Sequence, residues 1–323
     1  MWDRTRSSSG ARRWLILLCL ALAPMVARAE PLRFFAVGDL PYVRAEVEQL
    51  QELLTMATRE GSPFIVHVGD IKGGSAPCTD ANLSEIAALF RALPVPVLYT
   101  PGDNEWTDCH RPGAGGLDPN ERLARVREVF FGDESVMRLE RLGALRAAGE
   151  DGLQYPENVA FLRDGILFVT LHVVGSDNGY RSRDTWALAE FAARDAANAR
   201  FLAQATERAV ETSADAMVLV FHANPGFERK RPTRGYAGFH ASLLTLMKTY
   251  PGPVLAIHGD THRVKHDRPL IDPATGQPFE RFTRTEVPGS PIVGGLWIEI
   301  DPAAAEPFEV REYYPIARDR LMP

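Results

Sequence analysis

The chain has 323 residues, with 36 Lys and Arg against 42 Asp and Glu, 45% apolar residues, 26 Gly and 24 Pro. These proportions are those of an ordinary globular protein, and they exclude a collagen-like chain, a coiled coil and a wholly disordered chain. The formal net charge of −6 disfavours binding to nucleic acid and to anionic lipid surfaces. The length suffices for one large domain or two small ones.

The first 29 residues have the pattern of a secretory signal peptide. Four arginines precede the apolar run Trp14–Ala23, and the small-residue site Ala27-Arg28-Ala29 follows it. The alternative is a membrane anchor, but about ten apolar residues are too few for a hydrocarbon core that needs about 20. No later stretch of the sequence is long enough to span a membrane. We therefore predict cleavage after Ala29 and a periplasmic or secreted mature protein, with a net charge more negative than that of the full chain.

Two cysteines, Cys78 and Cys109, remain after that cleavage. An exported protein meets an oxidising compartment, where two thiols commonly pair. We expect a disulfide between them, and two separate thiols are the alternative.

Residues 30–323 alternate short apolar runs with helical patterns, and neither a repeat nor a linker divides them, so we predict one domain. The runs rich in Val, Ile, Leu and Phe lack polar alternation, as strands covered on both faces do. We predict strands at Leu32–Val37, Phe64–Val68, Val95–Tyr99, Met217–Phe221 and Val254–Ile257. We predict helices at Arg44–Thr58, Asn82–Leu93, Asn120–Phe130, Arg183–Thr212 and Ala237–Tyr250. This alternation is typical of an α/β fold.

Two regions depart from the alternation. Val159–Leu162 and Ile166–Val174 flank Asp164-Gly165 and predict a β-hairpin. The part from Phe282 to Tyr314 predicts two or three more strands, after a loop at Asp267–Glu280. A sandwich of two sheets with helices outside would accommodate both regions.

Charged residues recur at the ends of the predicted strands. Four of the strands lead into a Gly-Asp pair: Gly38-Asp39, Gly69-Asp70, Gly102-Asp103 and Gly259-Asp260. A fifth strand ends in His222, and His262 lies two residues beyond Asp260. Ligands of an open α/β sheet bind outside the carboxyl ends of its strands, where these side chains converge if the strands are parallel neighbours.

A single Gly-Asp pair after a strand is usually only a turn, because Gly supplies positive φ and Asp caps the next helix. Four such pairs together with two histidines indicate a functional site rather than four separate turns. Crowded carboxylates raise one another's pKa unless a cation neutralises them, so the pattern indicates metal. Mixed Asp and His ligands suit Zn, Mn or Fe, and their number favours two ions.

On these residues the chain resembles the calcineurin-like metallophosphoesterases, with a pattern related to that of purple acid phosphatases. The family's motifs D-x-H, G-D, G-N-H-D/E, a single His and G-H-x-H correspond in that order to Asp39-Leu40-Pro41, Gly69-Asp70, Gly102-Asp103-Asn104-Glu105, His222 and Gly259-Asp260-Thr261-His262. The resemblance implies a four-layer α/β/β/α sandwich of two mixed sheets flanked by helices. It implies a bridging role for Asp70 and the metal ligands Asp39, Asp70, Asp103, His222, Asp260 and His262.

The chain departs from the family at four motif positions. Pro41 stands where the family has a ligand His, and Asp103 where it has a ligand Asn. Asn104 stands where the family has the His that protonates the leaving group, and Asp260 where it has another ligand His. Four ligating aspartates would cancel the charge of two divalent ions and so weaken the attraction for a phosphate dianion. A site richer in oxygen also prefers harder ions such as Mn, Fe, Mg or Ca over Zn.

Other residues are candidates for catalysis and substrate binding. Asn104 could donate a hydrogen bond to a phosphoryl oxygen, and His110 could supply the missing general acid unless it is an exposed loop residue. Arg229 and Arg231 could hold the substrate phosphate, and a solvated basic loop is the alternative. Tyr42 is either a further metal ligand or an aromatic residue at a helix start.

The resemblance implies an exported phosphoric mono- or diester hydrolase with two divalent or mixed-valence metal ions, Mn, Fe or Zn. A hydroxide shared by the ions would attack a small-molecule phosphate ester. The alternative is a degenerate phosphoesterase fold that acts as a metal-stabilised binding protein, motivated by the departures at Pro41, Asn104 and Asp260. A dinucleotide-binding oxidoreductase is excluded, because no G-x-G-x-x-G opens the first helix.

Overall fold

A computed structural model of the chain describes residues 30–147 and 149–315. The predicted signal peptide at 1–29 lies outside the described residues, and the described residues from Pro31 to 315 form one compact unit. None of the helices within the described residues is long and apolar enough to cross a membrane.

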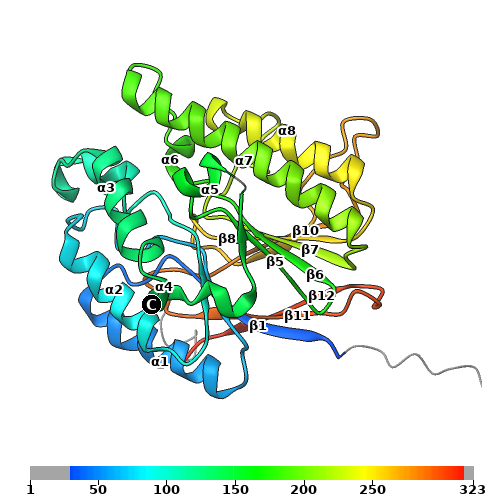
Figure 1. The fold of residues 1–323 in the computed structure, drawn as a ribbon, viewed down its shortest axis with the longest axis horizontal. Coiled ribbons are helices and arrows are strands. Elements are labelled where there is room, and N and C mark those ends of the chain that lie inside the picture. Colours follow the sequence, from blue (N-terminus) through cyan, green and yellow to red (C-terminus); the bar gives the residue numbers. More distant parts are fainter. Residues whose placement is uncertain (1–29, 148, 316–323) are drawn as a thin grey trace, which may run out of the picture. The chain divides into compact units, whose positions relative to one another are not determined.

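The first sheet has five strands in the order β12-β11-β1-β2-β3. Its strands are β1 (Leu32–Val37), β2 (Ile65–His67), β3 (Val97–Tyr99), β11 (Gly295–Ile300) and β12 (Phe308–Tyr313). β1, β2 and β3 run parallel, whereas β11 pairs antiparallel with both β1 and β12. The helices α1 (Arg44–Arg59) and α2 (Asp80–Ala92) connect the parallel strands and lie on the outer side of this sheet (Figure 1).

The second sheet has seven strands in the order β4-β5-β6-β7-β8-β10-β9. Its strands are β4 (Leu145–Arg146), β5 (Val159–Arg163), β6 (Ile166–Thr170), β7 (Ala216–Val220), β8 (Val254–His258), β9 (Lys265–Asp267) and β10 (Phe282–Glu286). β6, β7, β8 and β10 are parallel neighbours, and the remaining pairings are antiparallel. The helices α7 (Thr185–Glu211) and α8 (Arg234–Thr249) cover its outer side (Figure 1).

The core lies in the three spaces between these four layers. Alternate side chains of β1 point to opposite faces, so that Phe35 packs with the residues of α1 and Phe34 packs with the second sheet. The rings of Phe34 and Phe168 on β6 lie 5.4 Å apart between the sheets. Met217 and Leu219 of β7 pack with the residues of α7 and α8. The predicted α/β/β/α sandwich of two mixed sheets is therefore the observed fold.

The predicted hairpin is also present, as β5 and β6 with positive φ at Asp164 and Gly165. The helix predicted at Asn120–Phe130 is present as α3 (Pro119–Val126), which continues without a break into a π-helical turn, η3 (Arg127–Phe131). That turn allows the neighbouring side chains Phe130 and Phe131 both to be buried.

Several short elements carry no clear signal in the sequence. They are the helices α4 (Glu134–Met137), α5 (Glu150–Gln154) and α6 (Gly175–Asn178), and the 3₁₀ turns η1 (Thr107–His110), η2 (Pro112–Ala114) and η4 (Leu139–Leu142). Two of them, α6 and η1, lie beside the site described next.

Candidate metal centre

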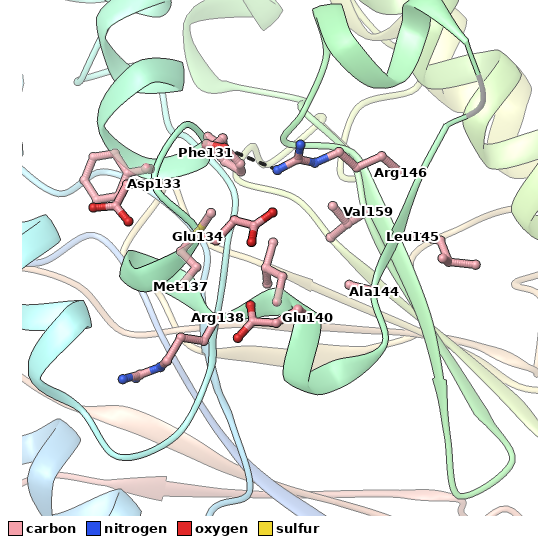
Figure 2. A pocket seen from close by; sticks show the side chains of 12 residues that line it. Phe131, Asp133, Glu134, Met137, Arg138, Glu140, Ala144, Leu145, Arg146 and Val159 are labelled. Atoms are coloured by element: carbon pink, nitrogen blue, oxygen red, sulfur yellow. Dashed lines mark hydrogen bonds between the residues drawn. The ribbon is translucent and has the colours of Figure 1, made fainter.

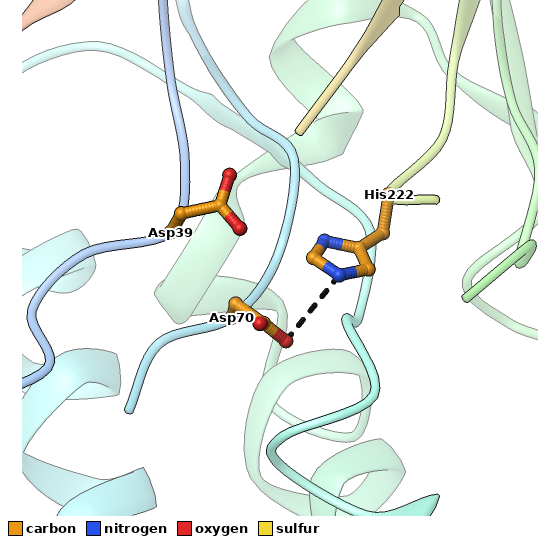
Figure 3. A group of neighbouring side chains, drawn as sticks. All are labelled: Asp39, Asp70 and His222. Carbon is orange, nitrogen blue, oxygen red and sulfur yellow. Dashed lines mark ion pairs between the residues drawn. The ribbon is translucent and has the colours of Figure 1, made fainter. Parts of the chain in front are cut away.

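The site forms where the strands of both sheets end. β1, β2 and β3 are parallel, so Asp39, Asp70 and Asp103 follow them at one edge of the first sheet. His222 and Asp260 follow β7 and β8, which are parallel neighbours in the second sheet. The five strands do not belong to one sheet. Their carboxyl ends meet across the sandwich, and Figure 3 shows Asp39, Asp70 and His222 directed toward one another.

The glycines before the aspartates make room for neighbouring carboxylates. A Cβ atom on Gly102 would lie 2.1 Å from Oδ1 of Asp70, and one on Gly259 would lie 2.1 Å from Oδ2 of Asp39. Asp39, Asp70 and Asp260 themselves adopt φ values of 54°, 55° and 81°. Such left-handed conformations cost roughly 1–3 kcal/mol each and persist where the surroundings fix them, as they do at functional sites. The glycines of the Gly-Asp pairs therefore let neighbouring carboxylates approach the backbone closely, and the pairs also reverse the direction of the chain.

The structure brings all six predicted ligands together. Oxygen and nitrogen atoms of two groups, each within 4.8 Å of one another, could hold a metal ion: Asp39, Asp70 and His222, and Asp103, His222 and Asp260. His222 Nε2 lies 3.5 Å from Asp70 Oδ1 and 3.2 Å from Asp103 Oδ1. His262 Nε2 lies 3.4 Å from Asp39 Oδ1. One imidazole nitrogen binds one ion, so His222 can complete only one of the two groups.

Both histidines are oriented by backbone carbonyls. Nδ1 of His222 lies 2.8 Å from the carbonyl oxygen of Val68, and Nδ1 of His262 lies 2.7 Å from that of Ser290. A carbonyl oxygen only accepts, so each Nδ1 carries the hydrogen and each Nε2 faces the carboxylates. This is the arrangement in which proteins present a neutral imidazole to a metal ion.

The cluster has an excess of buried negative charge. Burial raises the pKa of Asp70 well above its usual value, and Asp103 raises it further against the opposing effect of His222. Burial likewise raises the pKa of Asp260 to about 7. Burial alone would lower the pKa of His222, but Asp70 and the carboxylates around it raise that pKa above the ordinary value. A cation would relieve this imbalance, and the mixed oxygen and nitrogen donors fit Mn, Fe or Zn.

Tyr42 and Asn104 border the carboxylates. The Tyr42 hydroxyl donates to Asp70 Oδ2 at 2.7 Å and lies 3.0 Å from His262 Nε2. Asn104 Nδ2 donates to Asp70 Oδ2 at 2.6 Å and to the Tyr42 hydroxyl at 3.0 Å. Burial and the nearby carboxylates raise the pKa of Tyr42, so at neutral pH it keeps its proton and acts as a donor. Its backbone N–H donates to Oε2 of Glu46 in the first turn of α1 at 2.6 Å, so Tyr42 lies at a helix start and within the site.

The predicted disulfide between Cys78 and Cys109 is present. Of the other predicted residues, His110 is exposed and its Nδ1 lies 2.6 Å from the Thr107 carbonyl oxygen. Arg229 and Arg231 are exposed residues of the loop between β7 and α8. Within the described part of the chain, no hydrogen bond or ion pair joins these three residues to the six predicted ligands.

Ser176 and Asp108 lie beside the cluster and were not singled out from the sequence. The Ser176 hydroxyl lies 2.6 Å from Asp103 Oδ2 and 3.0 Å from Asp108 Oδ1. Ser176, Asp177 and Asn178 adopt φ values of 52°, 56° and 56°, three left-handed residues in a row. The only signal for this segment in the sequence is Asp177-Asn178-Gly179, a combination that is typical of a turn.

Glu105 and Lys72 were also missed as parts of this region. Glu105 Oε1 accepts hydrogen bonds from the N–H groups of Asp70 and Gly102 and from the Tyr99 hydroxyl, at 3.1, 2.8 and 2.8 Å. It thereby ties together the two loops that carry Asp70 and Asp103. Lys72 is buried nearby, and that burial lowers the pKa of its amine.

A separate cavity of about 310 Å³ opens between α4, η4 and the start of the second sheet (Figure 2). Its lining includes Phe131, Met137 and Arg146, and Arg146 donates to the Phe131 carbonyl oxygen. None of the predicted site residues lines it. The carboxylate cluster is therefore the better candidate for the functional site.

Comparisons with known proteins agree at the level of the fold. No family model matches the sequence, and no curated protein matches it. Among solved structures, the chain is similar to PhoD, with a TM-score of 0.50 and 11% sequence identity over 85% of this chain and 65% of that chain. Another match is purple acid phosphatase PPD1 from yellow lupin (Lupinus luteus) seeds, with a TM-score of 0.49 and 13% identity over 92% of this chain and 56% of that chain.

The chain thus spans less than two thirds of the length of either solved structure. The likeness to PhoD supports the predicted fold, a mixed α/β sandwich of two sheets flanked by helices. Together, this fold and the cluster define a class of protein: an α/β sandwich with acidic and histidine groups that could hold metal between the ends of its two sheets.

Proposed function

We propose that this chain is an exported, metal-dependent phosphoric ester hydrolase of the calcineurin-like metallophosphoesterase type, with residues 30–323 as its one domain. The observation that carries the proposal is the convergence of four aspartates and two oriented imidazoles between the ends of two sheets. The proposed ligands of a dinuclear centre are Asp39, Asp70, Asp103, His222, Asp260 and His262.

Two ions bound there would polarise a phosphoryl oxygen and activate a water for in-line displacement at phosphorus. The chain's own residues orient this chemistry. Tyr42 and Asn104 donate to the same oxygen of Asp70, which leaves its other oxygen directed at His222. Asn104 is the proposed donor to a phosphoryl oxygen of the substrate, to which one of the N–H groups that here donate to Asp70 and Tyr42 would turn.

His110 remains the proposed general acid, and Arg229 and Arg231 remain proposed substrate contacts. His110 lies in a small cleft whose lining also includes Asp108 and Ser176. Because Ser176 contacts Asp103, this cleft borders the proposed centre. If His110 protonates the leaving group, His110→Ala will lower the rate and remove the basic limb of the pH profile. An unchanged rate and profile would exclude this role.

The test is metal content by mass spectrometry on the protein purified from the periplasm, with turnover of p-nitrophenyl phosphate and bis-p-nitrophenyl phosphate measured on the same samples. Asp70→Asn removes one charge from the cluster. Asp164→Asn makes the same chemical change in the exposed turn of the β5–β6 hairpin and serves as the matched control.

We expect about two ions of Mn, Fe or Zn per chain, and turnover that falls at least 100-fold in Asp70→Asn but not in Asp164→Asn. The preferred substrate of the two distinguishes a monoesterase from a diesterase. One ion or none, with no turnover after metal is added back, would contradict the proposal. The chain would then be a degenerate fold that binds a partner.

A further inference from the structure

Arg111 is linked to the proposed centre through the hydroxyl group of Ser176. Its Nη2 forms an ion pair with Asp108 Oδ2 at 2.7 Å and donates to the Ser176 hydroxyl at 3.2 Å. That hydroxyl is in turn 2.6 Å from Oδ2 of Asp103, a proposed ligand. The Arg111 side chain is 49% exposed, so it is fixed at one end and open to an incoming ligand.

The backbone around Arg111 is held rigidly. The disulfide between Cys78 and Cys109 anchors the chain two residues earlier. The N–H of Arg111 donates to the Asp108 carbonyl oxygen at 3.0 Å, and the Arg111 carbonyl oxygen accepts from the N–H of Ala114 at 3.0 Å. A guanidinium placed in this way loses little conformational freedom when it binds an anion.

Gly74 shows that Arg111 and Asn104 face the same space. A methyl group on Gly74 would lie 2.8 Å from Oδ1 of Asn104 and 3.5 Å from Nη1 of Arg111. Within the described residues, Nη1 and Nε of Arg111 have no hydrogen-bond partner, so both remain as donors for a ligand.

We propose that Arg111 binds the phosphoryl group of the substrate and that this group is the terminal phosphate of a monoester. The inference rests on the proposed function. Because Nη2 is held by Asp108 and Ser176, Arg111 can donate charge-assisted hydrogen bonds to phosphoryl oxygens through Nη1 and Nε. A cationic donor also adds attraction for phosphate at a centre where four aspartates offset the charge of two divalent ions. A monoester has three non-bridging oxygens and a diester has two, so a donor added beside the centre contributes more to monoester binding.

The experiment compares wild type with Arg111→Gln and Arg111→Lys in the mature protein. It measures metal content, the Kd of inorganic phosphate by calorimetry on the metal-loaded protein, and KM and kcat for both p-nitrophenyl esters. Arg200→Gln is the matched control, because Arg200 on α7 is similarly exposed and also pairs with an aspartate, Asp151.

We expect Arg111→Gln to keep its metal and to raise the phosphate Kd and the monoester KM roughly 10- to 100-fold, with a smaller change in kcat and in the diester KM. Arg111→Lys should recover part of the loss, and Arg200→Gln should change neither constant. Should Arg111→Gln fold poorly, Gly74→Ala should raise the same two constants, since its methyl group enters the space between Asn104 and Arg111.

The outcomes separate this inference from the proposed function. Full metal content and turnover, with the phosphate Kd and the monoester KM unchanged in Arg111→Gln, would refute the role of Arg111 and leave the hydrolase intact. Equal losses for both esters would refute the monoester assignment. A loss seen in Arg229→Gln or Arg231→Gln in place of Arg111→Gln would move the phosphate contact to that loop. A wild type without metal or turnover would overturn both proposals.

Discussion

The pair of Glu157 and His172 and the cluster around Asp70 and His222 are both buried, yet their charges are balanced differently. Glu157 Oε1 lies 2.6 Å from Nη2 of Arg127 and 2.6 Å from Nδ1 of His172. Burial would raise the pKa of Glu157, but Arg127 and His172 lower it to about 2. In the other cluster, burial and the nearby Asp103 raise the pKa of Asp70. Burial alone therefore does not mark a functional site, whereas buried charge that the chain itself leaves unbalanced does.

The region around Glu157 and His172 also supports the cluster around Asp70 and His222. Arg194 is fully buried and donates to the His172 carbonyl oxygen and to both the side chain and the backbone of Asn178. Asn178 ends the left-handed segment whose Ser176 contacts Asp103. The network around Glu157 thus supports a strained loop that reaches the proposed metal centre.

The largest expected effect is the loss of activity when the unbalanced cluster is changed. Asp39→Asn or treatment with a chelator should lower turnover more than about 100-fold, because each removes part of the proposed centre. Glu157→Gln should keep its full metal content. Metal content and kcat are measured for Asp39→Asn, for the chelated wild type and for Glu157→Gln. Loss of metal in Glu157→Gln but not in Asp39→Asn would contradict the assignment of the metal centre to the cluster around Asp70.

The next largest effect concerns stability. Glu157→Gln should lower the free energy of unfolding by about 3–5 kcal/mol, since it leaves Arg127 without its buried partner. Urea unfolding of the metal-loaded protein measures this. Glu60→Gln is the control, because Glu60 pairs with Arg33 at the surface, where a salt bridge contributes about 0–1 kcal/mol. Equal losses in both variants would show that the balance of charge around Glu157 has no special role.

The pH dependence of the metal-free protein is a third test. Asp260 has a pKa of about 7 in the folded state and an ordinary value of 3.8, and Asp108 behaves similarly. In the unfolded chain both carboxyl groups lose their protons near pH 4, whereas in the folded protein they keep them up to about pH 7. The free energy of unfolding should therefore be greatest near pH 4 and fall as the pH rises to about 7. Each group contributes at most about 4 kcal/mol to this fall.

Asp260→Asn should reduce that pH dependence, and added metal should remove it in the wild type. Urea unfolding of chelated protein between pH 4.5 and 7.5 measures the slope. A slope that is the same in Asp260→Asn and in wild type would show that Asp260 is not destabilised by the cluster.

The smallest effect is expected at the edge of the cluster. Tyr42→Phe removes one hydrogen bond to Asp70 and should lower kcat about 3- to 10-fold with unchanged metal content. A drop in metal content of one ion per chain would show instead that Tyr42 is a ligand. Tyr180→Phe is a control for the same chemical change, because the Tyr180 hydroxyl accepts a hydrogen bond from Arg234 rather than contacting a proposed ligand, and its kcat should not differ from wild type.

Local patterns were enough to predict most of the fold. β1 is found at the predicted residues, and β2, β3, β7 and β8 lie within one or two residues of them, because a buried strand is a short apolar run that ends at a turn. The same turns identified Asp39, Asp70 and Asp103. The helical stretch predicted to end at Phe130 ends at Phe131, but its last turn is π-helical, and no local pattern reveals that change of helical pitch.

The sequence by itself therefore determined the class of fold, the strand ends and the types of ligand offered, since each depends on neighbouring residues. Only the tertiary structure decided which sheet each strand joins, and that Tyr42 meets His262 across 220 positions of sequence. It also decided that Ser176 contacts both Asp103 and Arg111. These contacts form where loops from two sheets fold over the same space, and their geometry depends on packing between distant segments that no short stretch of residues encodes.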